Sequence, residues 1–457
     1  MDNRHVSLSS HSELPPEILV QIFSYFEYSL PHTFTVDSIP GHAETLKSIC
    51  QVSKHFKALA QPLLFRSVII HGKSKSLDIL IDVLSRSPHL GKLVKELDCN
   101  VRSNNLPSTL ETHSQFARVR SNLEIPDEIA DGISQGLSSE DTDTTHDAIV
   151  AFWLALMPNL AMLEIALPRC PHLVLSLVEN TLAVTDTSLT RDQSACLSLL
   201  AHLEAIPGWP HDGSSPDSNL LRVGTFESFL KLPCLKTFFI QTAIWKQRES
   251  DQDYLMQDCR LERLCTAQLE IRPSGIQNLL STCNLRSLSL GIDPIPDLDS
   301  RYYNIGDLLR AYGKNLEFLE LRINGRWPGE SLTEEAYVAR RIGNLQTLSR
   351  LKHLELILWF TNDDMKNDTR YPTRLNLAEN LPSSIEVFRA YLPFREENKE
   401  GLGKELCVLA ETERFSSLRE VYVATAPKFP RAIRRTGWTY CDKEDGCKIR
   451  PMRTATE

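Results

Sequence analysis

A short apolar phrase, Leu-x-x-Leu-x-Leu, recurs along the second half of the chain and restricts its possible folds. Three clear copies begin at Leu285, Leu316 and Leu351, and two looser ones begin at Ile385 and Leu418. Successive copies start 31, 35, 34 and 33 residues apart. A repeat of this length corresponds to one supersecondary unit that must stack on its neighbours to bury its apolar face. Because 457 residues are too many for one compact core, such an array is favoured.

Each repeat is expected to hold a helix followed by a short strand. The second and third leucines have one residue between them, which is the period of a strand, and the first leucine belongs to the turn before it. Helical runs precede most copies, for example at 275–280, 305–310 and 339–348. Weaker copies of the phrase begin at Leu160 and Leu235. Alternating helices and parallel strands predict an α/β solenoid.

These repeats resemble a degenerate leucine-rich repeat array. The units are longer than the usual 20–29 residues. The Asn or Cys commonly found after the third leucine is replaced by Gly291, Arg322 and Ile357. The resemblance implies a curved sheet of parallel strands with helices on its other face.

The N-terminal region predicts packed helices. Leu14-Pro15-Pro16-Glu17 is a helix start, because proline suits the first turn and Glu17 suits the positive end of the helix dipole. Apolar residues then recur with helical spacing from Ile18 to Phe26, and a second such run begins at Leu46. The segment 67–70 predicts a strand.

The two apolar runs together resemble an F-box of the fungal type. The first half reads Leu-Pro-Pro-Glu-Ile-Leu-x-x-Ile-Phe-Ser-Tyr-Phe over 14–26, and the second reads Ser-Lys-x-Phe-x-x-Leu-Ala-x-Pro-Leu-Leu-Phe over 53–65. The segment 27–44 is longer than the usual loop between the helices. The predicted fold class is therefore α/β, with an N-terminal trihelical F-box followed by a leucine-rich-repeat-like solenoid. The resemblance implies that the module binds a Skp-type adaptor and, through it, a cullin.

A module of about 50 residues cannot bury all of these large apolar side chains by itself. Such a surplus is typical of a partner surface. Residues Ile49, Val52 and Phe56 of the second half are expected to support the core of the module. The alternative is three packed helices without a partner. The residues predicted to contact the adaptor are Leu14, Pro15, Ile18, Leu19, Ile22 and Phe23.

Substrate contacts are predicted at the outward positions of the repeat strands, because strand side chains alternate faces. The set mixes both signs of charge with aromatic residues, which favours a protein ligand over a nucleic acid. The alternative is that these positions are ordinary solvated or helix-covered surface. The predicted residues are Phe239, Ser289, Glu320, Arg322, Glu355, Ile357, Arg389, Tyr391 and Tyr422.

Composition and patterning also predict the domain boundaries of the chain. We expect a disordered N-terminus at 1–12, the F-box at 13–70, the solenoid at 71–430 and a C-terminal hairpin or tail at 431–457. Residues 102–147 are rich in Ser, Thr, Asn and acidic residues, which predicts a mobile insertion within the solenoid.

Several other function classes are disfavoured. A net charge of −9 argues against general nucleic-acid binding. The most apolar stretch, 149–163, is interrupted by Pro158-Asn159, which predicts a buried helix and strand rather than a membrane span. Cysteine spacing does not suit zinc, and a P-loop would need a glycine at Ser67. We expect no cofactor, no metal and no catalytic residue. The polar first residues predict a cytoplasmic or nuclear protein rather than a secreted one.

Three functions are compatible with these patterns. The first is a substrate-recognition subunit of a Skp–cullin–F-box ubiquitin ligase, in which the repeats hold a protein substrate and the chain performs no bond chemistry. The second is an adaptor-bound scaffold or regulator outside ubiquitin transfer. The third is an enzyme, which would need a deep pocket with converging titratable groups. The sequence favours the first.

Overall fold

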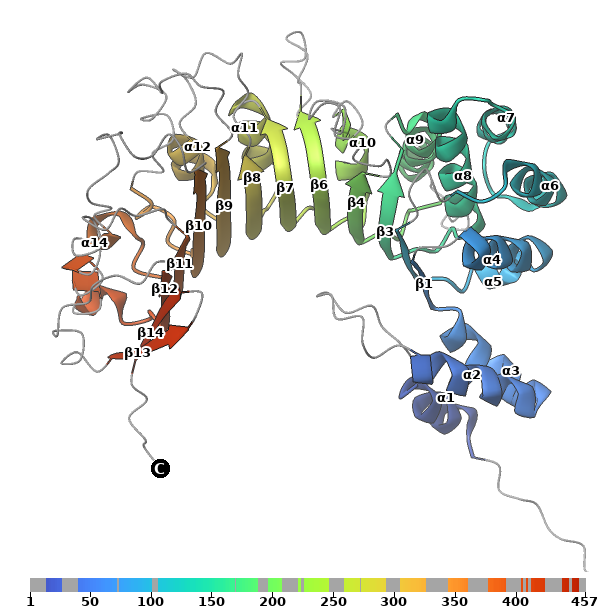
Figure 1. Ribbon diagram of the computed structural model, residues 1–457, viewed down its shortest axis with the longest axis horizontal. Coiled ribbons are helices and arrows are strands. Elements are labelled where there is room, and N and C mark those ends of the chain that lie inside the picture. Colours follow the sequence, from blue (N-terminus) through green and yellow to red (C-terminus); the bar gives the residue numbers. More distant parts are fainter. Residues whose placement is uncertain are drawn as a thin grey trace, which may run out of the picture. The chain divides into compact units, whose positions relative to one another are not determined.

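Figure 1 shows the computed structural model of the protein, in which helices and strands alternate along most of the chain. The described residues are 14–26, 40–71, 74–100, 106–168, 170–187, 196–207, 221–222, 226–245, 259–271, 273–292, 305–325, 344–360, 377–391, 404–405, 408–409, 412–423, 438–443 and 446–451. Among the helices of this part of the chain, none has the length and apolar character needed to cross a bilayer.

The chain divides into two compact units. Unit 1 takes Met1–Ala166 and His172–Leu200, and unit 2 takes Leu167–Pro171 and Ala201–Glu457. The boundary expected after residue 70 lies within unit 1 and stays a prediction. There the first strand pairs directly with the second, so the N-terminal module leads into the sheet without an intervening linker.

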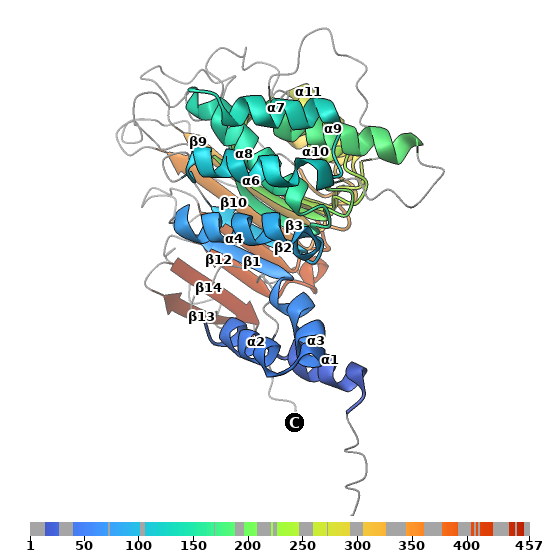
Figure 2. The same cartoon turned by 90° about the vertical axis from the view of Figure 1, so that its right-hand side faces the viewer.

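Unit 1 holds the N-terminal helices, three parallel strands and a set of helices on one side of them. Strand β1 pairs with β2, and β2 pairs with β3, all in parallel. Figure 2 shows α4, α6, α7 and α8 gathered on the same side of β1. The elements are α1 (Pro16–Ser24), α2 (Pro40–Val52), α3 (Lys54–Leu64), β1 (Ser67–His71), α4 (Ser74–Arg86), α5 (Pro88–Gly91), β2 (Glu96–Asn100), α6 (Thr109–Val119), η3 (Arg120–Asn122), α7 (Asp127–Leu137), α8 (Thr142–Leu156), β3 (Met162–Leu167) and α9 (His172–Thr187).

The prediction of a mobile insertion at 102–147 is wrong for residues 106–147, which form α6, η3, α7 and the start of α8. Helix α7 buries Ile129, Ile133 and Leu137, spaced four residues apart on one face. Helix α6 buries Phe116, whose ring packs edge-on against Phe152 of α8 at 5.2 Å between centroids. The polar composition reflects only the outer faces of these helices, while a narrow apolar stripe suffices to dock each one.

The apolar stretch 149–163 forms the end of α8 and the start of β3, as predicted, and α8 is buried along most of its length. Its Asp147 carboxylate accepts hydrogen bonds from the backbone amides of Leu173 (2.7 Å) and Val174 (3.2 Å) at the start of α9. A side chain of one helix thus satisfies the free amides of the next. Burial raises the pKa of Asp147 to about 6 and lowers that of its neighbour His146 to about 4.

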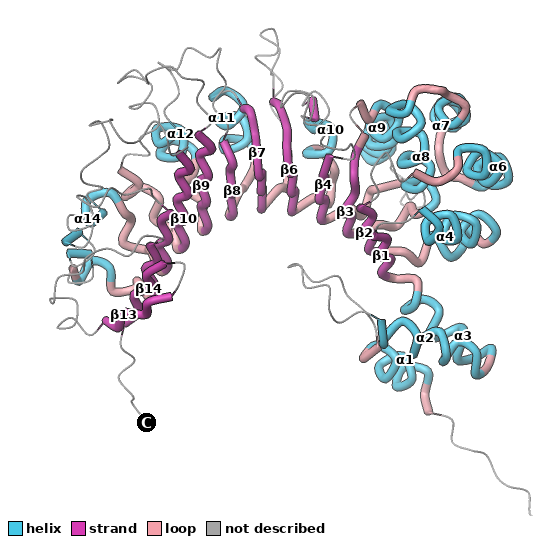
Figure 3. Tube along the Cα trace, viewed as in Figure 1, coloured by secondary structure: helices cyan, strands magenta, loops and turns pink. Residues whose placement is uncertain are grey.

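Unit 2 is a repeated arrangement of strand and helix. Its strands pair in parallel in the order β4-β6-β7-β8-β9-β10-β11-β12, with β5 beside β6, and β14 and β13 follow antiparallel. Figure 3 shows α11, α12 and α14 on one side of these strands. The elements are β4 (His202–Pro207), β5 (Leu221–Arg222), α10 (Phe226–Leu230), β6 (Thr237–Trp245), β7 (Arg263–Ile271), α11 (Pro273–Thr282), β8 (Ser287–Ile292), α12 (Ile305–Tyr312), β9 (Phe318–Gly325), β10 (His353–Phe360), α14 (Leu377–Asn380), β11 (Val387–Tyr391), η9 (Glu413–Phe415), β12 (Glu420–Val423), β13 (Trp438–Lys443) and β14 (Gly446–Pro451).

The apolar phrases occupy the positions expected of them. In Leu285-x-x-Leu288-x-Leu290, Leu288 and Leu290 are buried on β8 and Leu285 is buried in the turn before it. The residue after this phrase is Gly291, where a side chain would not fit. A Cβ there would lie 1.8 Å from the carbonyl oxygen of Ala267, beside an irregularity in the β7–β8 pairing.

A backbone hydrogen-bond motif repeats at the N-terminal edge of the strands. At most of the parallel strand pairs, the carbonyl of the residue before one strand accepts the amides of two successive residues at the start of the next. The carbonyl of Glu317, for example, accepts from Lys352 (2.8 Å) and His353 (3.0 Å). In unit 2, the residues whose carbonyls accept these bonds alternate in charge after Ala201. We call them, with Arg419 that follows, the edge row: Lys236, Glu262, Arg286, Glu317, Lys352, Glu386 and Arg419. Repetition of one motif supports a solenoid-like α/β fold.

Candidate functional site

The first candidate site is the trihelical module formed by α1, α2 and α3. Its core holds Leu19, Phe23, Leu46 and Ala60. Several partly buried residues pack around them: Phe26, Ile49, Cys50, Phe56, Leu59, Leu63 and Leu64. The rings of Phe23 and Phe56 meet edge to face, with 5.5 Å between their centroids. Helix α3 begins at a Ser53 cap, whose hydroxyl accepts from the amide of Phe56 at 3.1 Å.

Helix α1 carries two apolar stripes, one buried and one exposed. Leu19, Phe23 and Phe26 follow helical spacing on the inner face. Ile18, Ile22 and Tyr25 follow the same spacing one residue earlier, and their exposed fractions are 42 %, 41 % and 75 %. Leu14 and Pro15, just before the helix, are also exposed. The carbonyl of Pro15 accepts the amides of Ile18 (3.0 Å) and Leu19 (3.2 Å), which fixes the start of the helix.

Two of the six predicted adaptor contacts are corrected by this arrangement. Leu19 and Phe23 are 8 % and 5 % exposed and belong to the core of the module, so they are not available to a partner. Leu14, Pro15, Ile18 and Ile22 are exposed, and their role in adaptor binding stays a prediction. Ile49 and Phe56 pack against the core as expected, whereas Val52 does not, because it lies at the last turn of α2 and is 67 % exposed.

The sequence reasoning missed three exposed apolar side chains of the module. Tyr25 extends the exposed stripe of α1, and Val20 is exposed on the same helix. The third is Val52. The available signal was the spacing itself, since Tyr25 stands seven residues after Ile18 and three after Ile22.

The second candidate site is the face of the unit 2 sheet that α11 and α12 leave uncovered (Figure 3). Six predicted substrate contacts lie there in register. One residue of each successive strand, from β6 to β12, aligns with the next, and we call this set the central row: Phe239, Cys265, Ser289, Glu320, Glu355, Arg389 and Tyr422. The structure therefore brings the six predicted residues together with Cys265, which the sequence reasoning missed.

Cys265 directly follows Leu264 in the segment Leu261-x-x-Leu264, which has the spacing of the repeated phrase, so its outward position could have been predicted from that spacing. Its thiol lies among the polar side chains of the row. Burial raises the pKa of Cys265, and the nearby Glu320 carboxylate acts in the same direction, while a hydrogen bond with Ser289 opposes both.

Two groups of ion pairs lie along the row, one within β9 and one across β10, β11 and β12. Arg322, two residues after Glu320 on β9, contacts the Glu320 carboxylate through Nε. Arg389 lies between two carboxylates, at 3.6 Å from Glu355 and 3.3 Å from Glu420. Three residues of the row, Glu320, Glu355 and Arg389, are therefore held in ion pairs.

Two of the predicted substrate contacts are corrected. Ser289 and Glu320 are 4 % and 6 % exposed, and the Ser289 hydroxyl donates to Glu320 Oε2 at 2.7 Å. Neighbouring side chains cover them, so they support the surface instead of forming its outer layer. The backbone of Arg322 pairs with that of Ile357, which pairs with Tyr391, but the side chains of Ile357 and Tyr391 lie outside the described residues.

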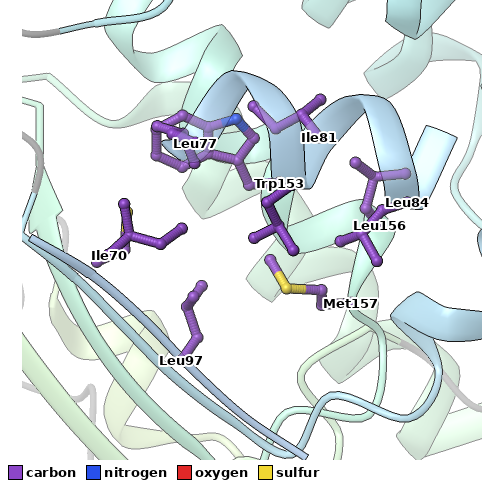
Figure 4. A pocket seen from close by; sticks show the side chains of 10 residues that line it. Ile70, Leu77, Ile81, Leu84, Leu97, Trp153, Leu156 and Met157 are labelled. Atoms are coloured by element: carbon purple, nitrogen blue, oxygen red, sulfur yellow. The ribbon is translucent and has the colours of Figure 1, made fainter. Parts of the chain in front are cut away.

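A small cavity in unit 1 offers no chemistry. Figure 4 shows apolar side chains around it, among them Ile70 of β1, Leu97 of β2 and Met157 after α8. Trp153 also lines it, and its buried Nε1 has no hydrogen-bond acceptor within the part of the chain that the structure describes. The space suits about one water molecule. No group of three or more metal-ligating side chains occurs among the described residues.

Comparison with known protein families gives a match for the trihelical module. The F-box-like family model matches residues 11–71, which contain α1, α2, α3 and β1. No curated protein matches the chain. F-box domains are typically non-catalytic adaptor components. The match identifies the N-terminal module as an F-box-like domain.

Proposed function

We propose that this protein is the substrate-recognition subunit of a Skp–cullin–F-box ubiquitin ligase. Its N-terminal module binds the adaptor, and its strand–helix repeats, a degenerate leucine-rich repeat array, hold a protein substrate. The chain itself makes and breaks no bond. Its contribution is to raise the effective concentration of substrate beside the ubiquitin-charged partner. Such a protein acts in the cytoplasm or the nucleus.

The exposed stripe of α1 is the observation that carries this proposal. The module fills its own core with Leu19 and Phe23 and still presents Ile18, Ile22 and Tyr25 to solvent. An apolar stripe that the fold does not need for its own core suits a protein partner. The F-box-like match supplies the class of partner.

The unit 2 sheet supports the second half of the proposal. Its uncovered face is a continuous surface of polar, charged and aromatic side chains in register across seven strands. Extended surfaces of this kind are what solenoids use to bind macromolecules. A small-molecule substrate would instead need a pocket with converging polar groups.

Reconstitution tests the proposal directly. The full chain is combined with a recombinant Skp-type adaptor, a cullin and its ubiquitin-charging partners, and complexes are separated by size. Co-elution of all three chains, with ubiquitin transfer to a bound protein, is the expected result. Elution with the adaptor but without the cullin would favour a scaffold or regulator outside ubiquitin transfer. Failure to bind the adaptor would refute both.

A further inference from the structure

Two cysteines occupy equivalent places in adjacent repeats of unit 2. Strand pairing aligns Arg263 at the start of β7 with Ser287 at the start of β8. Cys259 lies four residues before Arg263, and Cys283 lies four residues before Ser287. Neighbouring strands are about 4.8 Å apart, so equivalent positions bring two Cα atoms within the range of about 4.4–6.8 Å that a disulfide requires.

Backbone hydrogen bonds fix the two turns that carry these cysteines. The carbonyl of Glu262, which lies between Cys259 and β7, accepts the amide of Arg286 at 2.8 Å. The amide of Cys283 donates to the carbonyl of Leu279 at 3.0 Å, at the end of α11. These bonds hold the turn before β7 beside the turn between α11 and β8. The two sulfur atoms therefore stay close to each other in the folded chain.

The two thiols interact directly. The Cys283 thiol donates a hydrogen bond to the Cys259 sulfur, which lowers the pKa of Cys259 against the opposing effect of burial and raises the pKa of Cys283. The amide of Leu261 also donates to the Cys259 sulfur. Both cysteines are free thiols, and the two residues are 8 % and 6 % exposed. The arrangement offers a nucleophilic sulfur, a second thiol within reach, and access only to a small reagent.

The cysteines join two strands whose backbone pairing is interrupted. The register of β7 against β8 shifts between Thr266 and Leu269. By contrast, β9 and β10 pair without a shift from Phe318 and His353 to the ends of both strands. The stability of a repeat array depends on each interface between neighbouring repeats. A covalent bond between the turns before β7 and β8 would therefore reinforce one of the less regular interfaces of unit 2.

We propose that Cys259 and Cys283 are a site of reversible disulfide formation, with hydrogen peroxide as the oxidant. The Cys259 thiolate attacks one peroxide oxygen, the O–O bond breaks, and the other oxygen takes up a proton and leaves as water. The Cys283 sulfur then attacks the sulfur of the resulting sulfenic acid, the S–O bond breaks, and a second water leaves. The two thiols are oxidised by two electrons, and the peroxide is reduced to two waters. A thiol reductant reverses the link by exchange.

Mass spectrometry of the full chain tests the inference. The reduced protein is treated with a small molar excess of hydrogen peroxide, the remaining thiols are alkylated, and the chain is digested without reductant. The expected product is a pair of peptides joined through Cys259 and Cys283, which dithiothreitol separates again. Alkylation of both cysteines after the peroxide treatment would overturn the inference. So would oxidation of Cys259 to a sulfinic acid without a link to Cys283.

Thermal melting measures what the link does to the repeats. A disulfide from 259 to 283 closes a loop of one repeat and should raise the melting midpoint of the oxidised chain by about 5–10 °C over the reduced chain. Cys259→Ser or Cys283→Ser should abolish this rise.

The matched control is Cys234→Ser, because Cys234 lies in the preceding repeat but three residues before the start of β6 at Thr237, out of step with the pair. The control should keep the full rise. A rise that persists in Cys259→Ser, or that Cys234→Ser removes, would refute the assignment. The unaltered chain decides the question even where a serine variant does not fold, since absence of both the linked peptides and the rise would refute the proposal.

Discussion

Introducing two carboxylates into the exposed stripe of α1 should abolish adaptor binding without unfolding the module. In the variant Ile18→Asp with Ile22→Asp, both changes fall on side chains that are about two-fifths exposed. Covering the remaining area of two isoleucines contributes about 1.2–2.5 kcal/mol, if full burial of one gives about 1.5–3 kcal/mol. Placing charged groups beneath a partner adds at least about 2 kcal/mol of desolvation. The sum, about 3.2–4.5 kcal/mol, corresponds to about 200- to 2,000-fold weaker binding.

The assay is calorimetric titration of the purified chain with a recombinant Skp-type adaptor. The matched control is Leu110→Asp, because Leu110 is 84 % exposed on α6, outside the trihelical module. The control should bind like the unaltered chain, and both variants should show unchanged circular dichroism. An affinity within about threefold of the unaltered chain for the double variant would refute the assignment of this stripe.

Three further outcomes follow from the packing and the charges. Phe23→Ala should destabilise the trihelical module by about 3–5 kcal/mol, measured by urea denaturation, because it removes a ring from the core. In unit 1, Asp147 has a raised pKa of about 6 and His146 a lowered pKa of about 4. As the pH rises between these values, Asp147 lowers the free energy of unfolding and His146 raises it, so the two effects oppose each other. Asp147→Asn leaves the histidine effect alone, and stability should then increase with pH from about 4 to 6.5 by at most about 3 kcal/mol in thermal melts. Glu317→Lys places a like charge between two basic neighbours of the edge row and should cost about 0.5–2 kcal/mol at low salt and less at high salt, whereas an equal cost at both would contradict this.

The repeats were the most predictable part of the fold. Period-two leucines identified the strands, and the alternation of faces placed the central row correctly at Phe239, Glu355, Arg389 and Tyr422. The exposure of each residue was not predictable, because it depends on the side chains that strand pairing places beside it. Ser289 and Glu320 are covered by residues of adjacent strands that lie some 30 positions away in sequence.

The trihelical module shows a different limit. Its sequence displays more apolar residues than one core stripe needs. Separating the stripes required comparing two patterns offset by one residue, Leu19-Phe23-Phe26 against Ile18-Ile22-Tyr25. Both patterns have perfect helical spacing. Only contact with α2 and α3 decides which of them is buried.

Composition failed at 106–147, where polar content suggested mobility. Helices at the surface need only one apolar residue per turn, so their average composition is polar even when they are well packed. The informative signals were local: Ile129, Ile133 and Leu137 on one face of α7, and the Asp141 cap, whose carboxylate accepts from the amide of Thr144 at 2.9 Å at the start of α8. An average of composition over the whole segment hides both the apolar face of α7 and the cap of α8.

The junction between the trihelical module and the first strand bears on how a receptor of this kind would work. Helix α3 ends at Leu64 and β1 begins at Ser67, so only two residues separate them. Both are tied to the helix, since Phe65 donates to the carbonyl of Gln61 and Arg66 to that of Leu63. The Arg66 carbonyl in turn accepts the amides of Lys95 (2.8 Å) and Glu96 (3.0 Å), and the same motif recurs at later strands such as β9 and β10. The trihelical module is therefore joined to the first strands of unit 1 through backbone bonds. Raising the local concentration of a substrate depends on restricting the positions it can sample, and a flexible tether at this point would relax that restriction.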